Sequence, residues 1–216
     1  MKIISVNIGE PATIQWRGKN VKTGIYKYPV NEPIFLETED VKNDHVIDRR
    51  YHGGTEKACY SYSADHYSYW KKLYPNVDFH YGIFGENLTI QGLNEADIFI
   101  GDVFQIGEAK VQVTQPRQPC FKLGVRFGTQ KIIRQFIDSG YPGVYFRVLK
   151  HGQVKAGDEM DLIEKQTRNT VSIQKVFELL YTDEFQKEPV LNAINNRFLA
   201  ESCRKDLMKR WGDFLR

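Results

Sequence analysis

The sequence predicts a mainly β fold with some α-helix: a barrel-like β domain over residues 1–164, followed by a small helical bundle over residues 165–216. In the first part, short runs rich in Ile, Val, Phe and Tyr alternate with Gly, Asn, Asp and Pro at the intervals expected of a barrel or sandwich. After Lys165 the apolar residues recur at helical spacing instead. Two pairs, Gly101-Asp102 and Gly157-Asp158, each indicate a tight turn that enters an alternating strand.

The β pattern is clearest in six segments and is interrupted by two predicted helices. Ser63 can cap the first helix, which Pro75 ends. The second is predicted near Thr129–Ile137, with Gly140 beyond its end. The predicted strands are Ile3–Ile8, Pro33–Glu37, Val103–Ile106, Lys110–Thr114, Val144–Leu149 and Glu159–Ile163.

Three short amphipathic helices are predicted after Lys165. The first follows Ser172 as its cap, Pro189 opens the second, and the third contains Leu207 and Trp211. A bundle of this size would be marginally stable alone, so we expect it to pack on the β domain.

Composition excludes several classes of protein. The chain has 216 residues and a formal net charge of +3, with Lys and Arg interleaved with Asp and Glu, which does not indicate a nucleic-acid partner. No run approaches the roughly 18–20 apolar residues that cross a bilayer, and the N-terminus lacks the features of a signal peptide. Cys59, Cys120 and Cys203 are an odd, widely spaced set, which fits reduced thiols in the cytoplasm better than disulfides or a paired-cysteine zinc site.

The most unusual segment is Thr114–Cys120, which follows a predicted strand. Its two prolines stiffen the backbone and remove amide donors, so we expect the chain to leave the sheet here. Arg117 can bind an anionic oxygen in a bidentate fork, and its charge favours the thiolate form of Cys120. The alternative is a proline-stiffened turn with a buried, inert cysteine.

A second segment places two glycines among cationic side chains. Gly53 and Gly54 allow the backbone to approach a ligand and to present amides to an anion. Arg50, His52 and Lys57 flank them, which favours phosphate binding, although the P-loop pattern is absent. A glycine hairpin with solvated charges is the alternative.

The third segment, Tyr81–Ile90, holds two glycines and then a polar pair that enters a strand. Glu86 or Asn87 could hydrogen-bond a heterocycle, or Asn87 could brace a turn. A nucleophilic pair of Cys120 with His52 or His45 is also compatible with the sequence.

Taken in this order, the segments resemble the MOSC domain family, named for its occurrence at the C-terminus of molybdenum cofactor sulfurases. The matching pieces span about half the chain, and the tail after Lys165 is similar to the three-helix extension of stand-alone bacterial MOSC proteins. One position departs, because Asn43 stands before Asp44 where relatives often carry glycine. The matching pieces are Tyr51-His52-Gly53-Gly54 with Lys57 and Tyr60, Phe84-Gly85-Glu86-Asn87-Leu88, Ile100-Gly101-Asp102 and Gln115-Pro116-Arg117-Gln118-Pro119-Cys120.

The resemblance implies a MOSC β-barrel-like fold, a molybdopterin-type molybdenum cofactor, and Cys120 as the metal ligand. Relatives reduce N-hydroxylated compounds, including hydroxylaminopurine-type base analogues, which implies a detoxifying oxidoreductase. It also implies that Arg117 and Gln118 lie at the phosphate or an oxo group and that His52 donates a proton. The other cofactor-binding residues implied are Arg50, Gly53, Gly54 and Lys57 for the phosphate and Asn87 for the heterocycle.

The implied partners are the substrate and a separate electron-donor reductase, of flavin type. From Lys165 to Arg216, ten Lys and Arg stand against seven Asp and Glu, giving +3, so this tail is a hypothetical docking surface for the donor or a homodimer contact. Two other functions stay open: a cofactor carrier or sulfur-transfer module without reductase activity, and a β-barrel interaction protein.

Overall fold

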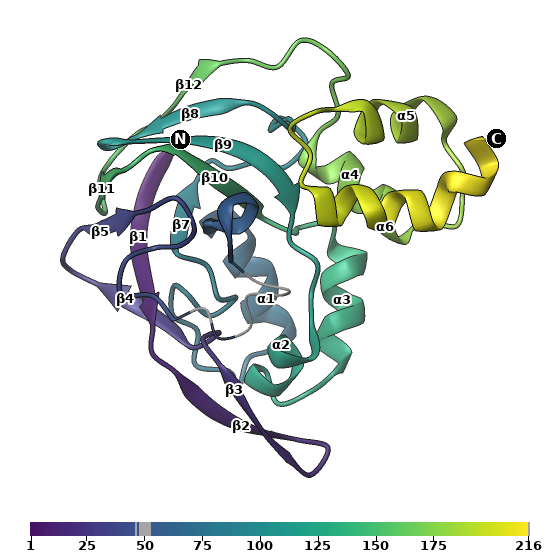
Figure 1. Cartoon of the computed structure of the whole chain (residues 1–216). Helices are drawn as coiled ribbons and strands as arrows, with labels where there is room; N and C mark the ends of the chain where they lie inside the picture. Colours follow the sequence, from purple (N-terminus) through teal and green to yellow (C-terminus); the bar gives the residue numbers. More distant parts are fainter. Residues whose placement is uncertain (46, 48–52, 216) are drawn as a thin grey trace.

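The computed structural model describes residues 1–45, 47 and 53–215, and its centre is a curved sheet with helices against it (Figure 1). The strands are β1 (Lys2–Gly9), β2 (Ala12–Trp16), β3 (Lys19–Thr23), β4 (Lys27–Val30), β5 (Ile34–Leu36), β6 (Cys59–Ser63), β7 (Leu88–Gln91), β8 (Val103–Ile106), β9 (Ala109–Pro116), β10 (Val144–Lys150), β11 (Gly152–Val154) and β12 (Met160–Glu164). The α-helices are α1 (Tyr67–Leu73), α2 (Phe121–Arg126), α3 (Lys131–Ser139), α4 (Ile173–Tyr181), α5 (Lys187–Asn195) and α6 (Glu201–Trp211). Three 3-10 helices are η1 (Thr55–Lys57), η2 (Ala64–His66) and η3 (Gly212–Leu215).

Eight strands form the main sheet in the order β12-β8-β9-β10-β6-β7-β1-β4, antiparallel except for the parallel pair β6 and β7. The sheet curls until β1 meets the start of β12, where the Met160 amide donates to Met1 O (2.8 Å) and the Ile3 amide to Asp158 O (2.9 Å). Along this seam the described residues form one isolated bridge, between Lys2 and Glu159, rather than a continuous ladder. The predicted mainly β fold with helices is therefore confirmed, as an open, barrel-like sheet.

The predicted exit from the sheet at Thr114 is wrong by two residues. Strand β9 continues to Pro116, which pairs with Val144 of β10. On the other side, the ladder with β8 stops at Gln112, opposite Val103. The last residues of β9 therefore lie along one ladder only, where a proline removes no second hydrogen bond.

Of the helix ends predicted at Ser63, Gly140 and Ser172, the last two follow the local chemistry. Helix α5 begins at Lys187, two residues before the Pro189 predicted to open it. Ser172 caps α4, since its Oγ accepts from the Lys175 amide (3.2 Å), and α3 ends at Gly140 with φ 68°. Ser63 stands at the start of η2 without a capping bond, and its buried Oγ has no partner among the described residues. Helix α2 was not predicted, because its six residues are too few for a periodic pattern.

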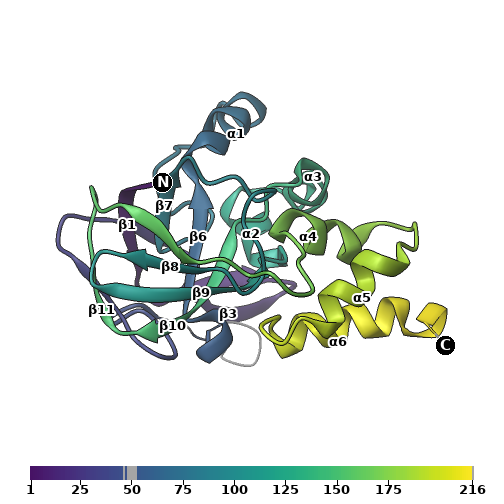
Figure 2. The same ribbon diagram turned by 90° about the horizontal axis from the view of Figure 1, so that it is seen from above.

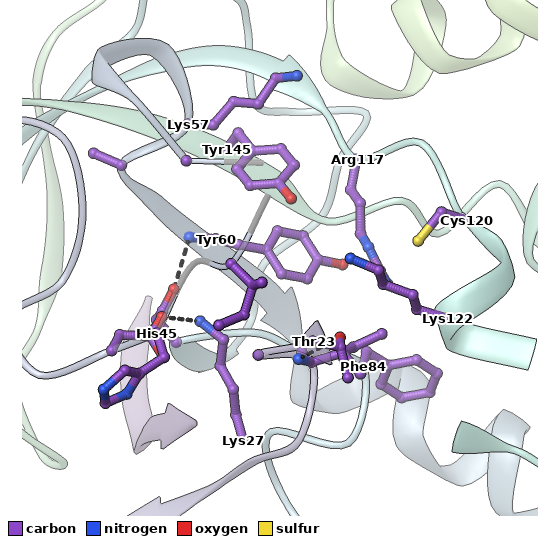
Figure 3. A pocket seen from close by; sticks show the side chains of 18 residues that line it. Thr23, Lys27, His45, Lys57, Tyr60, Phe84, Arg117, Cys120, Lys122 and Tyr145 are labelled. Carbon is purple, nitrogen blue, oxygen red and sulfur yellow. Dashed lines mark hydrogen bonds and ion pairs between the residues drawn. The ribbon is translucent and has the colours of Figure 1, made fainter. Parts of the chain in front are cut away.

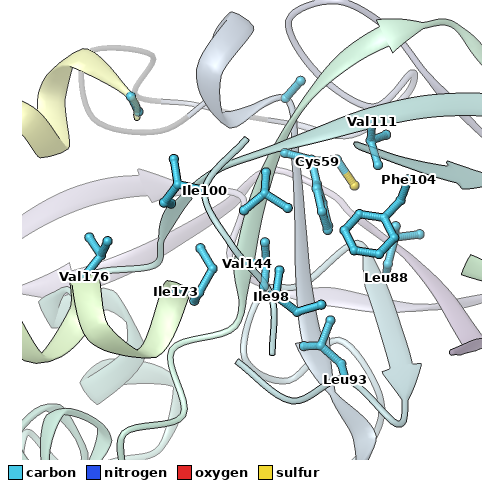
Figure 4. Close-up of a cluster of buried hydrophobic side chains, with 14 of the residues drawn as sticks. Cys59, Leu88, Leu93, Ile98, Ile100, Phe104, Val111, Val144, Ile173 and Val176 are labelled. Carbon is cyan, nitrogen blue, oxygen red and sulfur yellow. The ribbon is translucent and has the colours of Figure 1, made fainter. Parts of the chain in front are cut away.

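The tail packs on the β domain through a shared core (Figures 2 and 4). Ile173 and Val176 of α4 lie in the same cluster as Ile100 and Val144 of the sheet region. Cys203 and Leu207 of α6 are fully buried in it, as expected for amphipathic helices that need a partner surface. Within the described chain, no helix has the length and apolar character needed to cross a bilayer.

Candidate functional site

The predicted segments meet at one pocket, with a cavity volume of about 80 Å³ (Figure 3). The residues singled out from the sequence that line it include Gly53, Lys57, Asn87, Arg117 and Cys120. They come from three separate segments of the chain, which the curvature of the sheet brings together.

Arg117 projects from the end of β9 into the pocket and is only 6% exposed. Its guanidinium lies over the rings of Tyr60 (5.2 Å) and Phe136 (5.4 Å). Burial alone would lower the pKa of Arg117, but Tyr60, Tyr145 and Cys120 outweigh it and raise that pKa above its ordinary value. Nη1 is buried and has no hydrogen-bond partner among the described residues. A permanently charged, desolvated donor without an acceptor is costly, so its position suits an anionic ligand.

Cys120 is the residue immediately before α2, with extended backbone (φ −128°, ψ 166°) and a partly exposed side chain. In Figure 3 its sulfur lies on the same side of the pocket as Arg117 and Lys122. Sulfur is a soft donor that suits metals such as molybdenum. The pocket therefore presents a soft ligand atom beside two cationic side chains.

Sequence reasoning missed Lys122. It is 8% exposed and lines the pocket, and its ammonium makes no hydrogen bond or ion pair to any part of the chain that the structure describes. A single lysine carries no sequence signal of its own. Its place two residues after Cys120 was the available hint, because both side chains line the same pocket.

The two predicted glycines both adopt positive φ, Gly53 at 74° and Gly54 at 80°, which favours glycine there. Gly53 lines the pocket, whereas the Gly54 amide already donates to Glu39 O (2.9 Å). Burial lowers the pKa of Lys57, against the opposing effects of Cys203, Asp206 and Glu56. Lys57 thus lies between the pocket and α6.

Asn87 lines the pocket, but its amide group is used within the protein. Its Oδ1 accepts from the Tyr60 amide (3.3 Å), and its Nδ2 donates to Asn7 O (3.3 Å) and Asp44 Oδ2 (2.9 Å). Asn87 therefore braces this wall, in line with the alternative interpretation of its segment. Glu86, which is fully buried, has a similar task, because its carboxylate accepts from the Gly82 and Phe84 amides (2.7 and 3.1 Å).

Lys27 and His45 lie across the pocket from Cys120 (Figure 3), and Asp44 lies with them, held on several sides. It forms an ion pair with Lys27, and its Oδ1 accepts from the Gly9 amide (3.0 Å). Asn43, where relatives often carry glycine, has φ 65°, so it adopts the glycine-like conformation that asparagine tolerates best among the other residues. The His45 ring contacts Gly9 O through Nδ1 (3.1 Å).

The remaining predicted residues lie elsewhere. Gln118 points away from the pocket and donates to Asp206 Oδ2 of α6 (2.9 Å). Arg50 and His52 lie outside the described residues, so their assignments stay predictions. Cys59 and Cys203 are fully buried, and burial raises the pKa of each thiol to about 12, which makes them inert beside Cys120.

Several known proteins are similar to the chain, some of them over nearly its full length. An uncharacterized protein of Bacillus subtilis, YflK, is 37% identical over 208 residues, covering 96% of this chain and 93% of that protein. A reductase of Gibberella moniliformis is 34% identical over 151 residues, 68% of this chain but 27% of that protein. The crystal structure of YiiM from Geobacillus stearothermophilus superposes with a TM-score of 0.81 at 32% identity, covering 97% of this chain and 98% of YiiM.

The MOSC domain family model matches residues 48–161, just over half of the sequence. This range contains the Gly53-Gly54 turn, Asn87, Arg117 and Cys120, the segments that meet at the pocket. MOSC domains are associated with the molybdenum cofactor. From the match of both sequence and structure, the chain belongs to the MOSC domain family.

Proposed function

We propose that this protein is a molybdenum-cofactor-dependent oxidoreductase that reduces N-hydroxylated compounds, hydroxylaminopurine-type base analogues among them. The observation that supports it most directly is the Cys120 end of the pocket. There a partly exposed thiol lies with Lys122 and with Arg117, whose Nη1 has no acceptor among the described residues. The similarity to a fungal reductase supports an oxidoreductase.

The residues of this end fit a phosphate-bearing metal cofactor. A thiolate is a good ligand for molybdenum, since soft sulfur donors suit such metals. The unpaired Arg117 nitrogen is placed for an anionic oxygen, and the Lys122 ammonium adds charge beside it. Lys57 and the Gly53 backbone line the same pocket and are assigned to the phosphate. Cys120 would hold the metal.

The reaction converts an N–OH group, two electrons and two protons into N–H and water. Held by Cys120, the molybdenum cofactor would supply the two-electron chemistry of this reduction. Arg117 and Lys122 bind the anionic groups of the cofactor. Tyr60 and Tyr145 form an aromatic wall against which the substrate is oriented. His52 is proposed as the proton donor to the leaving water.

The electrons are proposed to come from a separate flavin-type reductase that docks on the tail. Arg204 is not available for this, because it donates to Asn196 O (2.8 Å) and Leu199 O (3.0 Å) and so braces the tail. Lys205 and Lys209 are exposed on α6. Neutralising both should slow turnover with the reductase and leave turnover with a small artificial donor unchanged; equal effects on the two rates would refute docking at this site.

The test of the function is metal analysis of protein purified from a molybdenum-replete host, followed by turnover of an N-hydroxylated amidine with an artificial donor. We expect about one molybdenum per chain and formation of the amidine. Molybdenum without turnover would indicate the carrier or sulfur-transfer function instead. Absence of molybdenum from freshly purified protein, and from protein incubated with the isolated cofactor, would refute both.

A further inference from the structure

Helix α6 contacts both of the loops that line the cationic side of the pocket. This helix belongs to the C-terminal tail, which follows the matched MOSC region, and its side chains lie outside the pocket. Figure 1 shows it running beside the end of β9, where the Cys120 loop begins. Its N-terminal half therefore lies where it can fix the geometry of the site without touching a ligand.

Three hydrogen bonds join α6 and the residue before it to the end of β9 and to the Cys120 loop. The Ala200 amide donates to Thr114 O (3.1 Å), and Ser202 Oγ donates to Gln115 Oε1 (3.2 Å). Further along, Gln118 Nε2 donates to Asp206 Oδ2 (2.9 Å). The last bond matters most, because Gln118 lies between Arg117 and Cys120.

Because prolines lie on each side of Gln118, its side-chain hydrogen bond is an important restraint on the loop. Pro116 and Pro119 have no amide hydrogen, so they cannot tie the loop to the body as donors. The backbone dihedral φ is fixed at both prolines, so a restraint on Gln118 is transmitted to its neighbours in the loop. Fixing one side chain thus orients Arg117 on one side and Cys120 on the other.

A second set of contacts joins α6 to the η1 turn. The Glu201 amide, at the start of α6, donates to Glu56 Oε2 (2.9 Å), and the other Glu56 oxygen pairs with Arg147 of β10 (3.2 Å). Asp206 also acts electrostatically on Lys57, the next residue after Glu56. The same helix thus fixes the turn that contributes Lys57 to the pocket.

We propose that Asp206 is a positioning residue, which holds the loop of Arg117 and Cys120 in place through Gln118 and so prepares the pocket for its ligand. The role of the pocket rests on the proposed function, but the restraint on the loop does not. It is a property of the cofactor-free protein and can be measured there.

The experiment compares Asp206→Ala, Asp206→Asn, Gln118→Ala and the double variant with Glu188→Ala, an exposed acid of α5, as control. Hydrogen exchange of the cofactor-free proteins is measured by mass spectrometry. Asp206→Ala and Gln118→Ala should each speed exchange of residues 117–122 by about two- to tenfold, the range that corresponds to one lost hydrogen bond. The double variant should add nothing further, because both changes remove the same bond.

Asp206→Asn keeps a side-chain oxygen that can accept from Gln118, so it should restore slow exchange in the loop although it lacks the charge near Lys57. Unchanged exchange of residues 117–122 in Asp206→Ala would overturn the proposal. Equal acceleration in β8 and α5 would also overturn it, because that result indicates general loosening of the fold.

Molybdenum content of the same variants provides the link to function and should fall in Asp206→Ala. If the wild-type protein binds no molybdenum but the loop responds as expected, the proposed function fails and the positioning role stands.

Discussion

The two ends of the pocket differ in how their polar groups are satisfied. At the Asp44 end, the carboxylate accepts from Lys27, Gly9 and Asn87, so each charge has a partner inside the protein. At the Cys120 end, the buried Arg117 Nη1 and the Lys122 ammonium have none among the described residues. Both ends contain cations, but within the described part of the chain the cationic groups without a hydrogen-bond partner lie at the Cys120 end.

This difference indicates that the Asp44 end supports the fold and that the Cys120 end binds the ligand. Buried polar groups in stable proteins are almost always hydrogen-bonded, since each orphan costs free energy. The Asp44 end follows that rule and contributes stability. The Cys120 end departs from it, which is expected where a ligand completes the hydrogen bonds. Substitutions at the two ends should therefore affect different measurements.

The largest effect is expected at Cys120. Cys120→Ala removes the proposed metal ligand, so molybdenum content should fall to background and turnover should drop by at least about a hundredfold. The fold should be nearly unchanged, because the side chain is only partly buried. Cys203→Ala is the matched control and should retain both metal and turnover. A Cys120→Ala protein with full activity and bound metal would show that the assignment is wrong.

Native-state alkylation should separate the three thiols next. Burial raises the pKa of Cys59 and Cys203 to about 12, so both stay protonated from pH 8 to pH 10. Only the thiolate reacts, so Cys120 should be labelled at least about a hundredfold faster than either, as measured by peptide mass spectrometry. Labelling of Cys59 or Cys203 at a comparable rate in folded protein would contradict the burial that sets Cys120 apart.

Lys27→Ala should mainly reduce stability. It leaves the Asp44 side chain, 2% exposed, without its cation, and we expect a loss of about 2–3 kcal/mol in the free energy of unfolding. The measurement is urea unfolding of cofactor-free protein. Lys122→Ala is the control, with an expected change within about 0.5 kcal/mol, because no protein partner is left behind. Equal losses would remove the distinction between the two ends.

The proposal that the Cys120 end binds the ligand is tested by measuring how well variants retain the cofactor. Lys122→Ala and Lys57→Ala should each weaken cofactor retention by about tenfold at low salt, because a charge-assisted contact to an anion is lost. The deficit relative to the wild type should be smaller at high salt, because salt screens the contact that the wild-type lysine makes. Metal and phosphate per chain, measured after dialysis at two ionic strengths, check this. Unchanged occupancy in both variants would favour the hairpin interpretation of the Gly53-Gly54 segment and would leave Lys122 without a function.

Much of the fold was predictable because periodic patterns extend over several residues. Val103–Ile106 was predicted as a strand with the bounds of β8, and Ser172 was identified as the cap of α4. The missed features are local or tertiary. Helix α2 is too short to show a period, and β9 runs past Thr114 because of where β8 ends, which no local pattern records.

The site was predictable to the extent that its residues lie in distinctive segments. Proline spacing and paired glycines identified Arg117, Cys120 and Gly53, which the fold brings to one pocket. Lys122 and the Lys27–Asp44 pair depend on burial and on contacts between distant segments, so sequence alone could not assign them. Gln118 was placed with the cofactor because of its neighbours, yet its side chain points to α6.

The smallest expected effect is at Asn43, and it tests whether the Asp44 end is scaffold alone. Asn43 has φ 65°, a region in which a β-carbon is unfavourable and asparagine is tolerated better than alanine. Asn43→Ala should therefore lower the free energy of unfolding by about 1 kcal/mol. Asn43→Gly should change it by less than about 0.5 kcal/mol, because two effects offset each other: glycine adopts this positive φ without strain, but it loses more conformational entropy on folding. Thermal and urea unfolding measure the stability of both variants.

Cofactor retention should be the same in the two variants, because the charges at the Cys120 end are untouched. A loss of retention in Asn43→Gly without a loss of stability would mean that the Asp44 end contacts the ligand after all, and that its satisfied hydrogen bonds do not mark it as scaffold.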